Sequence, residues 1–208
     1  MIYLSNVRLS FPALVEPRAP SSTPDAVKKY SADFILDQAH PGLAEFMKEY
    51  GRLAVEKWGE NAQAVMQMVQ ADRKLRCYGS GSERINKKTF KVYDGYEGKY
   101  YIGANRVDAP QMIRPDGTSV EVSNTMEYQA LARKLYGGCM VNAAINPWLQ
   151  SNAFGNGIRC DLVAVQFLAD AEPFGEGAAD AAPMFGAVAG APAAAGAVPA
   201  FAMPPFAQ

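Results

Sequence analysis

Short runs in which apolar and polar residues alternate limit the fold of this chain more than any other feature. Residues 7–11 (VRLSF) and residues 30–36 (YSADFIL) place an apolar side chain at every second position. Successive side chains of a strand point to opposite faces of a sheet, so this period predicts two half-buried strands. Because proline cannot donate to a sheet ladder, we expect the first strand to end at Pro12.

Further strands are predicted beside turn-forming residues. Residues 89–93 and 99–103 flank the sequence DGYEG and predict a hairpin, and residues 111–114 and 118–122 flank PDG and predict a second hairpin. Two more strands are expected nearer the C-terminus. They cover residues 139–145 and 158–168 and are joined by a loop that contains Pro147, Trp148, Phe154, Gly155 and Gly157.

The apolar period changes to three and four residues from Pro41 onward. This change predicts an amphipathic helix over residues 41–58, followed by a second, shorter helix after Gly59. Asn124 and Glu127 have the spacing of a capping box, which predicts another short helix. Strands in hairpins with two or three inserted helices predict an α+β, mainly β fold built on an antiparallel sheet or small barrel.

The composition divides the chain into a domain and a tail. The 208 residues are 49% hydrophobic and 20% charged, which is enough for one packed domain, placed at residues 1–172. Residues 173–208 are rich in Ala, Gly and Pro and cannot bury enough surface to order themselves, so we expect a disordered tail. Repeated prolines make the uncharged end of this tail a poor membrane span, and no membrane association is expected.

Charge is distributed unevenly along the chain. All twenty Lys and Arg lie at or before Arg159, whereas five of the twenty-one Asp and Glu lie after it. Residues 1–159 therefore carry a net charge of +4 and the remainder carries −5. Within residues 73–101 eight bases face three acids. A basic body with an acidic end is typical of a protein that binds a polyanion.

Basic and aromatic residues are densest between positions 85 and 106, where five cations and five aromatic rings occur. On a hairpin, alternate side chains in this segment would form one exposed face of lysines and tyrosines. Tyrosines can stack on unpaired bases while ammonium groups contact phosphates. The pattern predicts a DNA-binding surface made of Arg84, Lys87, Lys88, Lys91, Tyr93, Tyr96, Lys99, Tyr101 and Arg106, with Tyr93 and Tyr101 as stacking platforms and Tyr96 at the loop tip.

Other residues are weaker candidates for the same surface. They are Lys28, Lys29, Tyr30, Trp148, Phe154 and Arg159. Of these, Tyr30 and Trp148 fit the core better. The alternative interpretation of the whole cluster is a solvated hairpin whose tyrosines form cross-strand pairs.

Neither a cofactor nor a metal site is expected. Cys77, Cys139 and Cys160 are far apart, and the single histidine, His40, precedes a helix, so the ligand spacing of a zinc site is missing. The free thiols fit a reducing cytosol. Residues 79–82 (GSGS) lack the G-K-[ST] of a phosphate loop and are interpreted as a linker or loop tip.

Several sequence blocks resemble those of tailed-phage and prophage single-stranded DNA-binding proteins, a family first catalogued as a domain of unknown function. The matching blocks are VRLSFP (7–12), KYSADFIL (29–36), DGYEGKYY (94–101), LYGGCMVNA (135–143) continuing through Pro147 and Trp148, and residues 157–174. The resemblance implies an OB-like five-stranded barrel with helical insertions. It also implies stoichiometric binding of single-stranded DNA during phage replication and recombination, in the cytoplasm of the bacterial host.

The tail is similar in logic to the acidic tails of bacterial single-strand binders, which end in Pro-Phe and recruit replication enzymes. Here Pro205-Phe206 is followed by Ala207 and Gln208, and the last acid is Asp180. Recruitment of replication or recombination proteins through the tail, and assembly into a homo-oligomer, are therefore left open.

Two alternative functions also stay open. One is a Mg²⁺-dependent phage DNA-processing nuclease that uses Asp94, Glu97 or Asp108. The other is a virion or scaffold protein that does not bind DNA, in which the basic hairpin is a plain solvated face.

Overall fold

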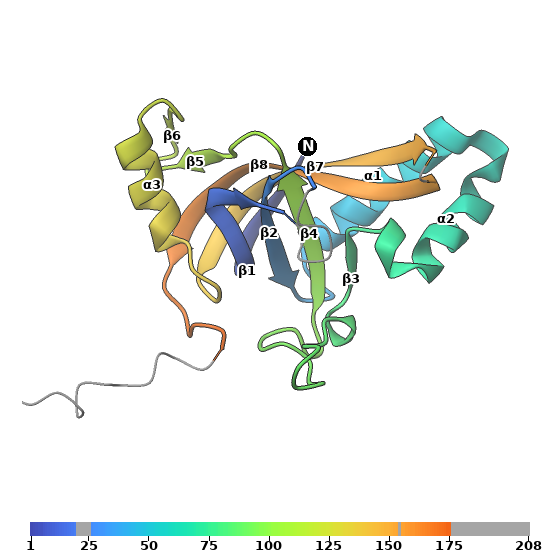
Figure 1. The fold of residues 1–208 in the computed structure, drawn as a ribbon. Helices are drawn as coiled ribbons and strands as arrows, with labels where there is room; N and C mark the ends of the chain where they lie inside the picture. Colours follow the sequence, from blue (N-terminus) through green and yellow to red (C-terminus); the bar gives the residue numbers. More distant parts are fainter. Residues whose placement is uncertain (20–25, 154, 176–208) are drawn as a thin grey trace, which may run out of the picture. The chain divides into compact units, whose positions relative to one another are not determined.

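One twisted sheet organises the computed structural model, which describes residues 1–19, 26–153 and 155–175. Among these residues eight strands pair in the order β3-β4-β2-β1-β7-β8-β5-β6 (Figure 1). The pairs are antiparallel except for β5 with β8. The strands are β1 (Ile2–Arg18), β2 (Lys29–Leu36), β3 (Tyr78–Ser80), β4 (Tyr100–Arg106), β5 (Gln111–Ile113), β6 (Ser119–Val120), β7 (Met140–Asn152) and β8 (Gly155–Ala169).

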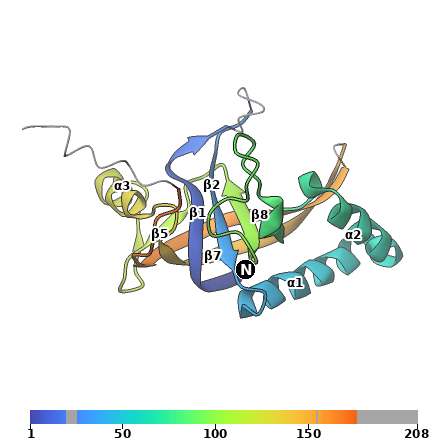
Figure 2. The same cartoon turned by 90° about the horizontal axis from the view of Figure 1, so that it is seen from below.

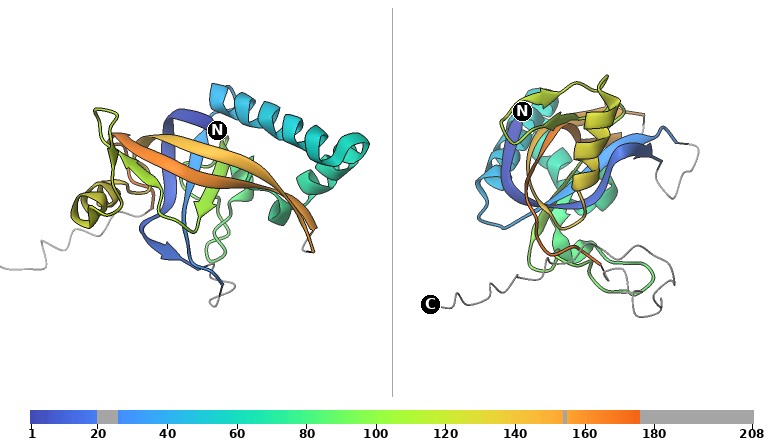
Figure 3. Two further views of the ribbon diagram at one scale, coloured as in Figure 1. Left: turned by 90° about the horizontal axis from the view of Figure 1, so that it is seen from above. Right: turned by 90° about the vertical axis from the view of Figure 1, so that its left-hand side faces the viewer.

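The sheet curls around the main core, as Figures 2 and 3 show. Leu4, Phe34, Ile102, Ile145 and Leu162, from five strands, are completely buried within it. The curl brings β4 close to β8, but no strand pairing between them closes the sheet among the described residues. The predicted α+β, mainly β architecture with helical insertions is confirmed, whereas the described strands number eight rather than five.

The first strand continues past Pro12, so the prediction that it ends there is wrong. Asn6 and Phe11 have positive φ angles of 55° and 46°, and the pairing of β1 with β2 changes register between Ser10 and Ala13. Pro12 lies within this irregular stretch, where a missing N–H breaks no regular ladder bond. The bulge bends β1 and leaves the Phe11 side chain half exposed.

The hairpin predicted for residues 89–103 does not form. β4 instead pairs with β2 on one edge and with β3 on the other. Residues 81–99, called here the 81–99 loop, bond mainly among themselves: the Tyr93 N–H donates to the Arg84 carbonyl at 2.9 Å and the Asn86 N–H to the Lys91 carbonyl at 2.8 Å. Within the described chain the only strand-like contact of residues 85–93 is the bridge between Ile85 and Val92.

The GSGS segment is not a linker, because Tyr78–Ser80 forms β3 and Gly79 and Gly81 are buried. A Cβ atom at Gly81 would lie 1.8 Å from the Tyr96 carbonyl oxygen. Only glycine therefore allows the 81–99 loop to close against the end of β3.

The second predicted hairpin is confirmed as β5 and β6. The two C-terminal strands are also confirmed, but they are longer than expected. The ladder between β7 and β8 begins where Met140 pairs with Ala169 and ends where Asn152 pairs with Gly155. Pro147 and Trp148 therefore belong to β7 and not to a loop. In the described chain β1 pairs with β7 only as far as Ile2–Ile145, so Pro147 lies where β7 is an edge strand, a position that tolerates proline.

The helices agree with their sequence signals. They are α1 (Pro41–Trp58), α2 (Ala62–Ala71) and α3 (Thr125–Lys134), with three short 3-10 helices, η1 (Gly59–Asn61), η2 (Arg73–Leu75) and η3 (Gly81–Glu83). His40 caps α1: its Nδ1 accepts from the Gly42 N–H at 3.0 Å, so its Nε2 donates to the Ser5 carbonyl at 2.8 Å. Asn124 caps α3 as predicted and donates to Glu127 at 2.8 Å.

One compact unit spans Met1–Gly175. The predicted disordered tail lies almost wholly in residues 176–208, outside the described part of the chain. The candidate residue Phe154 also lies outside the described residues. No helix within the described ranges is both long enough and apolar enough to cross a membrane.

Candidate nucleic-acid interface

An open groove of about 520 Å³ lies on the outer face of β2 and β4. Five basic residues and a single acidic residue line this basic groove, together with two aromatic rings. They are Arg73, Lys74, Arg76, Arg84 and Arg159, the acid Asp33, and the rings of Phe11 and Tyr101. The excess of cations suits a polyanion.

Strand alternation places the groove residues opposite the core. Phe34 pairs with Ile102, and both are completely buried inside the curl. Asp33 pairs with Gly103 and therefore lies on the other face. A Cβ atom at Gly103 would lie 2.7 Å from Asp33 Oδ1, so glycine at this position leaves room for the carboxylate.

A polar cluster of Asp33, Arg84 and Tyr96 forms one wall of the groove. The Asp33 Oδ2 atom accepts from Arg84 Nη2 and from the Tyr96 hydroxyl, the latter at 2.8 Å. Burial raises the pKa of the Asp33 carboxyl, while Arg84 and the Tyr96 hydrogen bond oppose that shift. The Arg84 guanidinium also lies 4.2 Å from the Tyr101 ring centroid, so it is held between a carboxylate and an aromatic face.

Tyr96 and Tyr101 are not exposed, contrary to the stacking surface expected from the sequence. Tyr96 is 0% exposed and Tyr101 is 3% exposed. With Ile35 they form a second, small hydrophobic core that fastens the 81–99 loop to the outer face of the sheet. Burial raises the pKa of both phenols. Tyr96 is therefore not at a loop tip, and Tyr101 meets the groove as the support of Arg84.

The accessible ring at this end of the groove belongs to Phe11, which is 49% exposed. The half-buried Tyr93 packs edge-on against it, with ring centroids 4.9 Å apart. Phe11 was not among the candidates from the sequence. The signal that could have identified it is an apolar residue directly before proline within an alternating run, since such a pair favours a bulge that turns a side chain outward.

The basic residues at the other end of the groove differ in their freedom. Arg76 has a nearly buried side chain that donates to the Tyr78 carbonyl at 2.6 Å and to Glu83 at 3.0 Å. Arg159 donates to Gln150 at 3.1 Å and to the Lys74 carbonyl at 3.2 Å. Arg73 and Lys74 are exposed on η2. Arg76 therefore braces the wall. Arg73 is exposed but donates to the Glu83 carbonyl at 2.5 Å, so Lys74 has the freer side chain of the two for a phosphate.

The structure separates the remaining predicted site residues from the groove lining. Lys87, Lys88 and Lys91 are exposed on the 81–99 loop. Lys99 forms an ion pair with Asp37, and Arg106 forms one with Asp108 at 3.3 Å. Of the nine candidates, Arg84 and Tyr101 line the groove and Tyr93 borders it through Phe11.

The described residues contain no group of three or more His, Cys, Asp or Glu side chains placed to hold a metal ion. Asp94, Glu97 and Asp108 therefore do not form a carboxylate cluster there. Asp94 accepts from the Gly175 N–H at 2.9 Å, and Asp108 pairs with Arg106.

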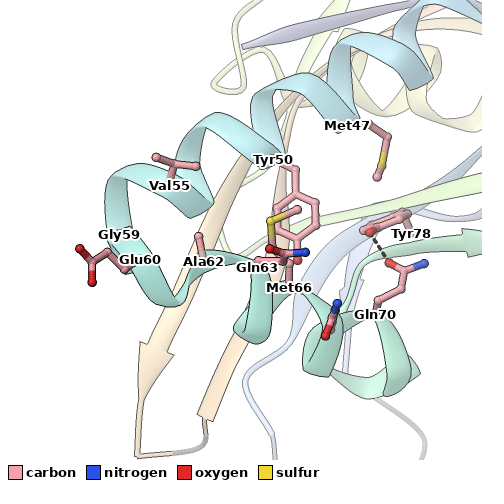
Figure 4. Close-up of a pocket in the computed structure, with 11 residues that line it drawn as sticks. Met47, Tyr50, Val55, Gly59, Glu60, Ala62, Gln63, Met66, Gln70 and Tyr78 are labelled. Carbon is pink, nitrogen blue, oxygen red and sulfur yellow. Dashed lines mark hydrogen bonds between the residues drawn. The ribbon is translucent and has the colours of Figure 1, made fainter.

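A second hollow, the α1–α2 cavity, has a volume of about 510 Å³ (Figure 4). Its lining is mostly apolar and includes Met47, Tyr50, Val55 and Met66. Among the described residues that line it, Glu60 is the one with a charge. The Tyr50 hydroxyl is buried without a hydrogen-bond partner in the described structure. This cavity offers nothing that would bind a phosphate.

A curled sheet with cations and aromatic rings in a groove on its outer face defines a class of proteins that hold one nucleic-acid strand. The family model described as "Enterobacter phage Enc34, ssDNA-binding protein" matches residues 1–194, so the chain belongs to this family. Putative protein p50 of Acyrthosiphon pisum secondary endosymbiont phage 1 is 30% identical over 175 residues, which cover 83% of this chain and 85% of p50.

Solved structures share the fold. The single-stranded DNA-binding protein from bacteriophage Enc34 is 24% identical, with a TM-score of 0.58 and 88% of each chain covered. The same protein in complex with single-stranded DNA is 24% identical, with a TM-score of 0.57, and the match covers 83% of this chain and 88% of that one.

Proposed function

We propose that this chain is a non-enzymatic protein that binds single-stranded DNA without sequence preference, and coats and protects it in phage replication and recombination. The basic groove carries the proposal, because it combines five cations with the accessible ring of Phe11 in a chain of this family. We place the activity in the cytoplasm of the bacterial host. Neither alternative, the nuclease or the scaffold protein, has a specific observation that favours it.

In the proposed mode of binding, Arg73, Lys74 and Arg159 attract the phosphates at one end of the groove. Arg84 is held rigidly by Asp33 and Tyr101 and meets the backbone in the middle. A base stacks on Phe11 at the other end, where Tyr93 supports the ring. Stacking needs only the flat face of a base, so this arrangement selects unpaired strands without reading their sequence.

Lys87, Lys88 and Lys91 extend the positive field over the 81–99 loop and would attract a strand before it enters the groove. Residues 176–208 are a candidate contact for replication or recombination proteins. Pull-down of phage and host proteins with the full chain, compared with a chain ending at residue 175, tests that role. Sedimentation of the full chain tests whether it forms homo-oligomers.

The test is a titration of the full chain with fluorescent oligo(dT) and with a duplex of equal length, at low and high salt. We expect preference for the single strand, with log affinity falling against log salt by about 0.7 for each neutralised phosphate. The oligonucleotide should remain intact on a gel with Mg²⁺. Equal affinity for the duplex, or no binding, would overturn the proposal, and shortened DNA would support the nuclease.

A further inference from the structure

The β7–β8 hairpin extends beyond the curled part of the sheet as a two-stranded arm (Figure 1). Leu149 and Ile158 lie on one face of this arm and are buried in the main core, on the side where α1 contacts β7 and α2 contacts β8. Side chains alternate along a strand, so the neighbouring residues lie on the other face. This face, called here the arm face, carries Trp148, Gln150, Arg159 and Asp161.

The Trp148 side chain on the arm face is fixed by a hydrogen bond and remains accessible to solvent. It is 40% exposed, and its indole Nε1 donates to Asp161 Oδ1 at 2.8 Å. A surface tryptophan that serves only to pack would be covered, whereas this one is fixed in orientation and still meets solvent. A ring in this state is suited to stacking.

Arg159 joins the arm face to the basic groove. It pairs directly with Trp148 across the two strands, and it also lines the groove. Its guanidinium is held by Gln150 and by the Lys74 carbonyl. Directly paired residues on neighbouring strands have Cβ atoms about 5 Å apart, so a cation and a ring lie side by side where the groove ends.

We infer that a single strand longer than the groove continues over Arg159 and stacks a base on Trp148. This inference rests on the proposed function and extends its binding site. Asp161 disfavours a phosphate beside the ring but not an uncharged base, so the chemistry of the arm face favours stacking there. The strand thus passes from β2 and β4 to β8 and β7, following the outer face of the curled sheet.

Intrinsic fluorescence provides the test, because Trp58 and Trp148 are the two tryptophans of the chain. In the Trp58→Phe variant, emission reports Trp148 alone. We expect oligo(dT) of about 20 nucleotides to quench this emission and oligo(dT) of about 5 nucleotides to leave it nearly unchanged, since the shorter strand fills only the groove. Anisotropy of labelled oligo(dT) measures binding of both lengths independently.

Affinity measurements with the full chain complete the test. Trp148→Ala should weaken binding of the longer strand by about 5- to 160-fold, the range of one stacked base, and leave the shorter strand unaffected. Trp148→Phe keeps a ring and should lie between. Met126→Ala, an exposed apolar residue on α3, is the matched control and should behave like wild type.

The possible results separate the two ideas. If both strands bind but neither quenches Trp148, and Trp148→Ala loses no affinity, the arm site is overturned while the groove stands. If neither strand binds, the proposed function fails and the arm site fails with it. If Trp148→Ala changes the sedimentation of the DNA-free protein, the ring contacts a second copy of the chain, which would also overturn the arm site.

Discussion

The basic groove and the α1–α2 cavity are nearly equal in volume, about 520 and 510 Å³, but their linings differ in kind. The groove has five cations and a buried carboxylate, whereas the cavity has thioether and aromatic groups, neutral amides and a single acid. Apart from Tyr78, the residues that line the cavity come from the successive helices α1, η1 and α2. The residues that line the groove come from segments far apart in the sequence, between Phe11 and Arg159. The lining of a hollow, and not its size, therefore decides which ligand it suits.

Arg84→Ala should destabilise the wall of the basic groove, because it leaves Asp33 without its cation and exposes the Tyr101 ring. We expect the free energy of unfolding to fall by roughly 2–3 kcal/mol, since a mostly buried charge loses its partner. Urea denaturation measures the loss. Arg84→Lys retains the charge and should recover part of the stability. An unchanged midpoint in Arg84→Ala would show that the Asp33–Arg84 pair does not hold the groove wall.

Phe11→Ala removes the accessible ring of the groove. We expect affinity for oligo(dT) to weaken by about 1–3 kcal/mol, the contribution of one stacked base, and the loss to persist at high salt. Titrations at two salt concentrations measure it. Met66→Ala makes a comparable apolar truncation in the α1–α2 cavity and should leave DNA affinity unchanged. Equal losses in the two variants would remove the distinction between the two hollows.

Lys74→Ala removes an exposed cation from a residue whose hydrogen bonds to Asp72 and Arg159 are made by its backbone atoms. The fold should be unaffected, and the slope of log affinity against log salt should decrease by about 0.7, the value for one phosphate contact. Lys134→Ala, an exposed lysine on α3, is the matched control. An identical slope in the two variants would mean that Lys74 contacts no phosphate.

Tyr50→Phe tests the other hollow. The Tyr50 hydroxyl is buried without a hydrogen-bond partner among the described residues, and burial raises its pKa to about 12. Removing a hydroxyl that makes no hydrogen bond should be neutral or should stabilise the fold by up to about 1 kcal/mol. Thermal unfolding measures this change. A clear destabilisation would reveal a polar ligand or ordered water in the cavity.

Cys77 is half-buried: it helps to line the groove, and it also packs against the main core beside Cys160. We expect its alkylation to report on occupation of the groove. Cys139 and Cys160 are buried, and burial raises the pKa of both thiols, so they should react slowly with a maleimide. Saturating oligo(dT) should slow alkylation of Cys77 severalfold, as followed by mass spectrometry. Cys77→Ser identifies the reactive site. Alkylation of Cys77 at the same rate with DNA bound would place the strand elsewhere.

The correctly predicted elements have signals contained in consecutive residues. The apolar period over Pro41–Trp58, the capping box at Asn124 and the turn at residues 115–117 each specify a local structure. The errors arose where pairing over long distances decided the outcome. The sequence alone predicts a strand end at Pro12 and a loop at Pro147. In the structure a bulge accommodates Pro12 within β1, and an edge position accommodates Pro147 within β7.

The candidate site was only partly predictable for the same reason. The excess charge of residues 73–101 pointed to the region of the basic groove, since Arg73, Lys74, Arg76 and Arg84 all line it. The predicted hairpin failed because both edges of β4 are occupied by β2 and β3. Tyrosine is equally suited to burial and to exposure, so its spacing alone did not show that Tyr96 and Tyr101 pack against Ile35.

The sequence by itself determined the fold class, the order of most elements, the basic character of the body and the resemblance to phage single-strand binders. These properties depend on local period, composition and residue identity. Only the tertiary structure decided which cations and rings share one site, because Phe11, Arg84 and Arg159 come to line the same groove through the pairing of β2 with β4 and the approach of β4 to β8. Contacts between residues so far apart depend on the register and curl of the whole sheet.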